Sequence, residues 1–257
     1  MQSPVFIVGS PRSGTSVLVD VLRSIGYHGF QEGNFLTILH HLNAIIDRQY
    51  VWFATEDKRV MVGNIDKGDL KRRLRETVRT IVNEVNPQEP WFDKTGNPEM
   101  ILEIPTLREL WPTAVFIKAK RRGIENVMSR MKKFPTHPFE YHCSNWAKNM
   151  AAWRTIREQI ASECFIEIEQ RDMIQQPEQT AQRLCAFLRV EDSKLATAAK
   201  VMNMNRPQES TKGSASRTSS LAESGWTTEQ IEVFLKHCEA EMTAFGYTMD
   251  EQYSVAP

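Results

Sequence analysis

The sequence predicts a three-layer α/β/α fold, in which helices cover both faces of a central, mostly parallel β-sheet. Short apolar runs, rich in β-branched and aromatic residues, alternate along the chain with longer segments whose apolar residues recur at helical spacing. The first apolar run passes directly into a glycine-containing turn and a helical pattern, and no internal repeat is evident. Strands and helices in this order form parallel sheets, which bind ligands at the carboxyl ends of their strands.

Four segments are predicted to be strands: residues 5–8, a short strand from Trp91 that runs into a loop, residues 114–119 and residues 164–168. Helices are predicted after the first strand and over about 36–46, 67–85, 98–110, 124–131, 144–161, 177–188, 192–203 and from Thr227 onward. Residues 50–63 are expected to be irregular. Residues 205–225 are polar and rich in Ser, Thr and Gly, which is typical of either a functional or a disordered loop. The length suits one domain spanning residues 1–257.

Composition excludes several classes of protein. Lys plus Arg and Asp plus Glu are equal at 32 each, so the overall charge favours neither nucleic acid nor an acidic membrane as a partner. No apolar run approaches transmembrane length, and no basic segment precedes the first strand, so neither a membrane span nor a signal peptide is expected. The four cysteines form no C-x-x-C pair, which argues against zinc or a disulfide framework and favours a reducing, cytoplasmic location.

The turn after the first strand, residues 9–16, is the strongest candidate for a binding site. A glycine-containing turn that opens a helix directs free backbone N–H groups and the positive end of the helix dipole at one point, which favours phosphate. Gly9, Gly14 and Ser16 fit the spacing of a Walker A loop, but Thr15 stands where its lysine belongs. The only cation in the turn is Arg12, so ordinary nucleoside triphosphate hydrolysis is not favoured.

Several stretches, taken in order, make most of the chain resemble the sulfotransferases that use 3′-phosphoadenosine 5′-phosphosulfate (PAPS). No single stretch is specific, but their joint order is. They are Pro11-Arg12-Ser13-Gly14-Thr15-Ser16, Asp93-Lys94-Thr95, Arg121 with Ser129 eight residues later, the segment from Arg171-Asp172 to Pro177-Glu178, and Gly225-Trp226 through Phe245-Gly246-Tyr247.

The resemblance implies a P-loop-like sulfotransferase fold, PAPS as the donor and 3′-phosphoadenosine 5′-phosphate (PAP) as the product. Arg12, Ser13, Gly14, Thr15 and Ser16 would hold the 5′-phosphosulfate, Arg121 and Ser129 the 3′-phosphate, and Lys212 and Arg217 would belong to a late loop that closes over it. A donor with phosphates at both ends of its ribose independently requires two anion sites, and a guanidinium at a strand end suits phosphate oxygens. Lys120 and Arg122 remain alternatives to Arg121.

Sulfuryl transfer needs stabilisation of the leaving phosphate and a base for the acceptor hydroxyl. Arg12 is the expected leaving-group cation and Lys94 the second, with no metal required. Gly96 stands where the family's cytosolic branch has a histidine base. Glu32 matches instead the glutamate of the branches that modify glycans and tyrosylproteins, so it is the expected base. His28, Asp93, His137 and His142 are reserve candidates.

Two other functions stay open: a P-loop kinase or nucleotidase that uses ATP, and a non-catalytic nucleotide-binding scaffold. The expected acceptor is the hydroxyl of a small molecule, a lipid or a glycan. Trp52, Phe53, Phe134 and Tyr141 could line an apolar pocket or simply pack. The basic helix 67–79 is either a solvated face or a landing site for an anionic acceptor or membrane.

Overall fold

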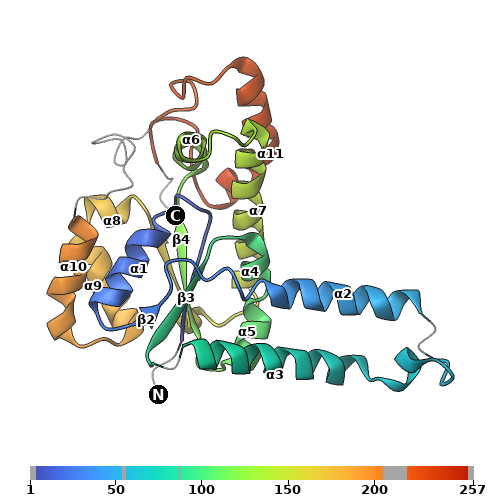
Figure 1. Cartoon of the computed structure of the whole chain (residues 1–257). Coiled ribbons are helices and arrows are strands. Elements are labelled where there is room, and N and C mark those ends of the chain that lie inside the picture. Colours follow the sequence, from blue (N-terminus) through green and yellow to red (C-terminus); the bar gives the residue numbers. More distant parts are fainter. Residues whose placement is uncertain (1–3, 54–55, 87, 205–218, 254–257) are drawn as a thin grey trace.

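A five-stranded parallel sheet lies at the centre of the protein, as the computed structural model shows for residues 4–53, 56–86, 88–204 and 219–253 (Figure 1). Every pair of neighbouring strands is parallel. The strand order is β2-β3-β1-β4-β5, with β1 at Val5–Val8, β2 at His28–Gly29, β3 at Trp91–Thr95, β4 at Val115–Lys120 and β5 at Phe165–Glu169. The predicted α/β class is confirmed, and the two-residue strand β2 lies within residues 26–30, for which the sequence predicts a turn or a short extended piece.

Strand β1 occupies the middle of the sheet, and this position decides where the glycine-containing turn lies. Val8 pairs with Thr95 of β3 on one side and with Lys118 of β4 on the other. All four residues of β1 are fully buried, as expected for a parallel strand covered on both faces. Since β3 and β4 lie on opposite sides of β1, the turn that follows β1 lies at the switch point of the sheet, where parallel α/β proteins bind ligands.

Helices cover both faces of the sheet (Figure 1). One apolar core unites β-strand residues with α1 (Thr15–Ser24), α9 (Pro177–Leu188) and α10 (Leu195–Asn203). The core of the opposite face includes residues of α3 (Lys67–Val85), α4 (Pro98–Leu102), α5 (Ile104–Leu110) and α7 (Phe139–Arg157). A short helix, α8 (Asp172–Gln175), leads from β5 to α9.

A third apolar cluster lies beyond the carboxyl end of β4. It joins α6 (Gly123–Lys133), α7 and α11 (Thr228–Ala244) with two tyrosines of the C-terminal segment, Tyr247 and Tyr253. Thr227 and Gln230 form a capping box at the start of α11, in agreement with the predicted cap. This cluster holds α6 firmly, and α6 carries several residues of the candidate site.

Helices α2 (Ile38–Trp52) and α3 form a hairpin that projects from the body of the protein as an arm (Figure 1). A short 3₁₀-helix, Met61–Asn64, lies near its tip. Helix α3 has the predicted bounds, and Asp66 caps it as expected. Helix α2, however, extends to Trp52, so part of the segment predicted to be irregular is helical.

Two further helices differ from the prediction. The segment predicted as one helix over 98–110 is divided at Glu103 into α4 and α5, because Pro105 at the start of α5 lacks the N–H that a continuous helix would need. Helix α7 begins at Phe139 rather than near residue 144, immediately after Pro138. Within the described part of the chain, no helix combines the length and the apolarity needed to cross a bilayer.

Candidate functional site

The turn after β1 is held in an unusual backbone conformation. Gly9, Arg12 and Gly14 have φ angles of 148°, 74° and 88°, in or near the left-handed region that side chains disfavour. At Gly9 a Cβ atom would lie 2.4 Å from the carbonyl oxygen of Ala119, so this close approach of β1 to β4 requires glycine. Helix α1 begins at Thr15, and the first N–H groups of a helix have no partner within it. The turn therefore leads directly into the N-terminus of α1, and its role as a phosphate cradle stays a prediction.

Helix α6 holds this turn from the side. Asn126, which is fully buried, donates from Nδ2 to the carbonyl of Pro11 at 3.1 Å and to the hydroxyl of Ser13 at 3.0 Å. Ser13 also donates its N–H to the carbonyl of Ser10 at 3.2 Å. Both polar groups of Ser13 therefore shape the turn, and the N–H groups that remain for a ligand are those of Gly14 and the start of α1. Asn126 was missed because a single asparagine within a helix carries no spacing signal.

Arg12, Arg121 and Ser129 meet although they come from three separate elements. The Arg12 Nε donates to the hydroxyl of Ser129 at 3.0 Å, and Arg121 donates from Nη1 to the carbonyl of Arg12 at 3.1 Å. Ser129 lies on α6, two turns after Arg121 at the end of β4. The structure therefore brings together the residues that were predicted for the two anion sites.

Arg121 is a buried cation that has no anionic partner among the residues that the structure describes. It is 8 % exposed, its Nε has no hydrogen-bond partner, and no carboxylate of the described residues lies within ion-pair distance of it. Burial lowers the pKa of the Arg121 guanidinium, and burial also lowers the pKa of Arg12. An unpaired buried charge is costly, so a position of this kind indicates a binding site for an anion.

The two neighbouring cations, Lys120 and Arg122, are poor alternatives to Arg121 as ligands of a phosphate, because both already form ion pairs with carboxylates. Lys120 lies 2.6 Å from a carboxylate oxygen of Glu167 and 3.4 Å from one of Glu169. Arg122 is fully buried, forms a bidentate pair with Glu125, and donates to the carbonyls of Thr248, Asp250, Gln252 and Ser219. Of three consecutive basic residues, only Arg121 is left to bind a ligand.

Glu32 and Lys94 form an ion pair across 62 residues of sequence. Lys94 lies on β3 and its side chain is buried, whereas the Glu32 side chain is 51 % exposed. The pair thus joins a buried cation to a carboxylate that solvent can reach. Both residues were predicted to belong to the site, and the tertiary structure brings them into contact.

The turn that carries Glu32 is anchored to β3 by its backbone. Gly33 donates its N–H to the carbonyl of Lys94 at 2.9 Å, and Asn34 donates its N–H to the hydroxyl of Thr95 at 3.1 Å. Thr95 in turn donates to Oδ1 of Asp93 at 2.8 Å. A Cβ at residue 33 would lie 1.7 Å from Oδ2 of Asp93, so any other residue would displace the Asp93 carboxylate. These contacts hold Glu32 in place beside Lys94.

A sulfotransferase family model matches residues 4–194, which include β1, the turn, β3, β4 and α6. The chain belongs to the sulfotransferase family. The matched segment contains the site residues up to Ser129 and also includes the two-residue strand β2 that precedes Glu32. No curated protein matches the sequence significantly.

Solved structures agree with this sulfotransferase in fold. The STF9 sulfotransferase from Mycobacterium avium is 14 % identical, with a TM-score of 0.55, and the match covers 93 % of this chain and 76 % of that one. The sulfotransferase domain of the Synechococcus PCC 7002 olefin synthase is 18 % identical, with a TM-score of 0.52 and 76 % of each chain covered. Mouse SULT7A1, complexed with PAP, is 15 % identical, with a TM-score of 0.51 and coverage of 96 % and 90 %. At these identities the likeness concerns the fold.

The other residues predicted for the site of this sulfotransferase differ in their exposure to solvent. Thr15 is buried and Ser16 half-buried at the start of α1. Lys212 and Arg217 lie outside the described residues. Of the reserve bases, His142 is buried, and its pKa is lowered by burial and by the nearby Arg130. The rings of His137 and His142 lie edge to face, with 6.1 Å between their centroids. His28 is an exposed residue of β2.

Arg130 is a further buried cation beside the turn, and the sequence analysis did not single it out. It is 2 % exposed, donates from Nη1 to the hydroxyl of Ser10 at 3.3 Å, and its guanidinium carbon lies 5.8 Å from the ring centroid of Tyr141. Burial lowers the pKa of Arg130. Its place directly after Ser129 is the one signal that could have drawn attention to it.

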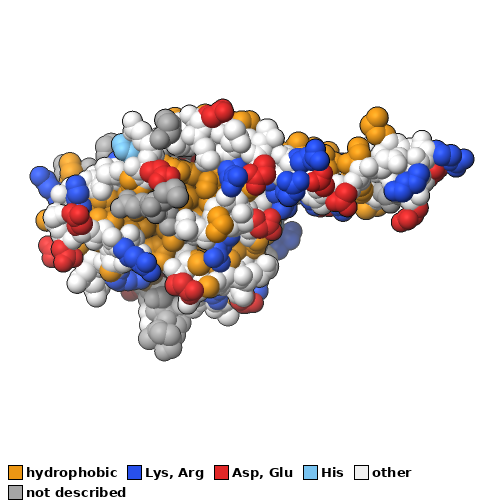
Figure 2. Space-filling view, turned by 90° about the horizontal axis from the view of Figure 1, so that it is seen from below, with side chains coloured by type: hydrophobic (Ala, Val, Ile, Leu, Met, Phe, Trp, Pro, Cys, Tyr) orange, Lys and Arg blue, Asp and Glu red, His pale blue; other side chains and the backbone are white. Residues whose placement is uncertain are grey.

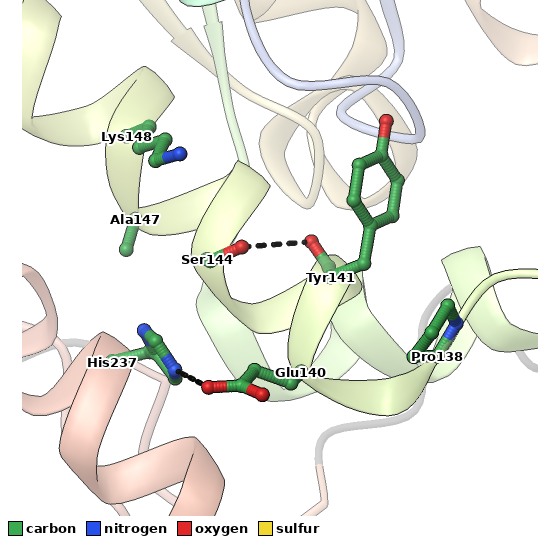
Figure 3. A pocket seen from close by; sticks show the side chains of 7 residues that line it. All are labelled: Pro138, Glu140, Tyr141, Ser144, Ala147, Lys148 and His237. Carbon is green, nitrogen blue, oxygen red and sulfur yellow. Dashed lines mark hydrogen bonds and ion pairs between the residues drawn. The ribbon is translucent and has the colours of Figure 1, made fainter.

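The pocket in Figure 3 is separate from this site. It has a volume of about 520 Å³, and residues from the end of a loop, α7 and α11 line it. Glu140 and His237 form an ion pair across it at 2.8 Å, and Tyr141 extends away from the other side chains shown (Figure 3). None of the residues predicted for the donor or for catalysis lines this pocket, but Tyr141, one of the aromatic residues expected either to line an apolar pocket or to pack, does line it.

Asp93, which accepts the hydrogen bond of Thr95 on β3, is expected to make the stability of the protein depend on pH. Burial, opposed by the Thr95 hydrogen bond and assisted by the charge of Glu32, raises the pKa of Asp93 from 3.8 to about 6. The native state therefore binds more protons than the unfolded state between about pH 4 and about pH 6, and stability is lost as the pH rises through that range. We expect Asp93→Asn to remove this loss, which amounts to about 3 kcal/mol at most.

Urea denaturation of wild type and Asp93→Asn at several pH values measures this contribution as the difference between the two free energies of unfolding. The contributions of all other titrating groups are the same in both proteins and therefore cancel in this difference. A difference that stays constant with pH, or that changes in favour of the wild type as the pH rises, would contradict the expectation.

Proposed function

We propose that this sulfotransferase moves a sulfuryl group from PAPS to an acceptor hydroxyl. The observation that supports the donor best is Arg121, a buried guanidinium that has no carboxylate partner in the described part of the chain. Arg121 donates to the carbonyl of Arg12, whose side chain in turn donates to Ser129. Such a constellation suits a ligand that carries two phosphates a short distance apart. PAP in the mouse structure of similar fold is consistent with this donor.

The donor would be oriented by both anion sites. Arg121 and Ser129 would bind the 3′-phosphate, and the N–H groups at the start of α1, with Thr15 and Ser16, would bind the 5′-phosphate at the positive end of the helix dipole. Arg12 would neutralise the charge that develops on the leaving phosphate. The Arg12–Ser129 hydrogen bond of 3.0 Å already holds that side chain beside both sites.

Glu32 would act as the general base, and Lys94 as the cation at the sulfuryl group. The exposed Glu32 carboxylate can accept the proton of an incoming hydroxyl, and the attacking oxygen then forms its bond to sulfur as the bond to the leaving phosphate oxygen breaks. Lys94, buried and in contact with Glu32, lies where it can stabilise the transferred group and hold the base in orientation. The proposed acceptor is a hydroxyl of a small molecule, lipid or glycan.

The basic helix α3 offers no support for an anionic acceptor. Its six basic side chains all lie within ion-pair distance of carboxylates, of which they share four, and this is typical of a solvated helix face. The pairs are Lys67 and Lys71 with Asp47, Arg72 and Arg73 with Asp69, Arg75 with Glu109, and Arg79 with Glu76.

Isothermal titration calorimetry with PAP in EDTA tests the donor, with ATP plus magnesium and AMP as comparisons. We expect metal-independent binding of PAP that is at least about tenfold tighter than binding of AMP, because AMP lacks the group that Arg121 and Ser129 would hold. Tighter binding of ATP with magnesium would support a kinase or nucleotidase instead. Absence of binding by every nucleotide would leave a scaffold role.

A further inference from the structure

Arg130 is the centre of a group of cationic and aromatic side chains that has no carboxylate of the described residues within ion-pair distance. We call this group, which consists of Arg130, His137, Tyr141 and His142, the Arg130 cluster. Arg130 lies on α6, directly after Ser129, and the other three lie at the start of α7 or just before it. Arg130 and His142 are 2 % and 1 % exposed. Such a group is costly to bury unless a partner supplies the missing negative charge.

Three buried nitrogen atoms of the cluster have no hydrogen-bond partner. They are the Nε of Arg130 and both ring nitrogens of His142. Arg130 donates from Nη1 to the hydroxyl of Ser10 at 3.3 Å, which uses one of its five N–H groups. The side chains that favour the charged form of Arg130, and so oppose the effect of burial on its pKa, are Tyr141 and Cys143, and neither is a carboxylate. The cluster therefore has a positive charge to neutralise and N–H groups that can donate to a ligand.

The two histidines of the cluster lie where their positive charges would oppose that of Arg130. The ring centroids of His137 and His142 are 6.1 Å apart, and those of His137 and Tyr141 are 4.6 Å apart. The pKa of His142 is lowered first by burial and then by the charges of Arg130 and His137. A bound anion would reverse the effect of these charges, because a negative charge favours the protonated form of a nearby imidazole.

The charges of the cluster differ from those found elsewhere in the protein. On the face that Figure 2 shows, basic and acidic side chains lie interspersed. Of the three buried arginines that the structure describes, Arg122 pairs with Glu125, whereas Arg121 and Arg130 have no carboxylate within ion-pair distance. The argument that assigns an anion site to Arg121 therefore applies to Arg130 as well.

The cluster contacts the first part of the turn after β1, which also packs against the end of β3. Arg130 donates to Ser10, the second residue of that turn. A Cβ at Gly96, directly after β3, would lie 3.2 Å from the carbonyl oxygen of Gly9 and 3.5 Å from the ring of Pro11. Strand β3 carries the cation proposed for the sulfuryl group, whereas the later part of the turn leads into α1, which is proposed to hold the 5′-phosphate. The cluster thus lies beside the part of the turn that borders β3.

We propose that Arg130 and His142 bind an anionic group of the acceptor, a carboxylate, phosphate or sulfate that is distinct from the reacting hydroxyl. The anion site rests on the cluster alone, whereas its assignment to the acceptor rests on the proposed function, which gives the two phosphates of the donor to other groups. A guanidinium and an imidazolium suit an oxyanion because both donate charge-assisted hydrogen bonds. His137 and Tyr141 are exposed and contact His142, so the cluster reaches the surface through them.

NMR of protein labelled at its histidines tests the anion site without a substitution in the protein under test. The chain has six histidines, so the signal of His142 is identified as the one that His142→Gln lacks. We expect inorganic sulfate, added with saturating PAP to fill the donor site, to shift this signal and to raise the pKa of His142 by about one unit or more. A signal that sulfate leaves unchanged both with and without PAP would overturn the proposal.

The titration without PAP separates this proposal from the proposed function. A response to sulfate in a protein that does not bind PAP would support the anion site and contradict the donor. A response that saturating PAP abolishes would assign the site to the donor, and this outcome would overturn the assignment to the acceptor.

Arg130→Met tests the cation of the site. We expect the dissociation constant of sulfate, measured by calorimetry with PAP present, to rise by about tenfold or more, because the variant removes a buried partner of the anion. Lys132→Met is the matched control, since Lys132 is an exposed cation of the same helix, and it should change the constant by no more than about twofold. Equal effects of the two variants would overturn the proposal. The titration of the wild type decides the matter if Arg130→Met does not fold.

Competition distinguishes an acceptor from the sulfuryl group of the donor as the source of the anion. We expect 4-hydroxyphenylacetate, which has a hydroxyl and a carboxylate, to displace sulfate from the PAP complex about tenfold more strongly than its uncharged amide does. Equal displacement by the two compounds, or displacement by neither, would contradict an anionic acceptor. Weaker binding of PAPS by Arg130→Met, with the affinity for PAP unchanged, would assign the site to the sulfuryl group and also overturn the proposal.

Discussion

Replacing Arg121 by methionine is expected to weaken PAP binding by about 30-fold or more, without lowering the melting temperature of the ligand-free protein. The loss follows because truncating one partner of a buried, hydrogen-bonded charge pair costs about 2–5 kcal/mol. The ligand-free protein should not lose stability, since methionine removes a buried charge that has no carboxylate partner among the described residues. Calorimetry measures the affinity, and thermal unfolding with and without PAP measures the stability.

Arg122→Met is the matched control, because the two arginines are adjacent and both buried. Arg122 holds Glu125 and several carbonyls, so its removal leaves a buried carboxylate without its cation and should cost about 3–5 kcal/mol of stability. A loss of stability in Arg121→Met as large as that in Arg122→Met would show that Arg121 is structural. Unchanged PAP affinity in Arg121→Met would remove the main support for the donor.

Glu32→Gln is expected to lower kcat by about 10²- to 10⁴-fold, the usual contribution of a positioned general base. Glutamine retains an oxygen that can accept a hydrogen bond from Lys94, so the geometry around β3 should persist and PAP affinity should change by no more than about twofold. The measurement is transfer of labelled sulfuryl from PAPS to a panel of hydroxyl acceptors, paired with calorimetry of PAP.

Glu56→Gln is the control for this experiment, since Glu56 is an exposed glutamate of the arm outside the proposed site. It should leave both the rate and the affinity unchanged. If Glu32→Gln retained full activity while still binding PAP, the base would be another group, and Asp93, whose pKa is raised to about 6, would be the next to substitute.

The parts of this protein that sequence alone determined are those whose causes are local. Helix α3 has its predicted bounds because Asp66 caps one end and its apolar positions share a face. The turn after β1 was evident because glycine spacing, a preceding buried strand and a following helical pattern occur within a few residues. The placement of Ser129 on α6, two turns after Arg121 at the end of β4, also follows from spacing alone.

The tertiary structure decided which of these residues remain available for a ligand. The three consecutive cations, residues 120–122, look equivalent in the sequence. In the structure Lys120 forms ion pairs with carboxylates and Arg122 donates to carbonyls that are distant in sequence, whereas the Nε of Arg121 has no hydrogen-bond partner. The ion pair of Glu32 with Lys94 depends on the parallel pairing of β2 with β3. The hydrogen bond from Asn126 to the turn after β1 depends on how α6 packs beside that turn. Such contacts join residues far apart in the chain, so their energies depend on packing and burial, which no local pattern of residues encodes.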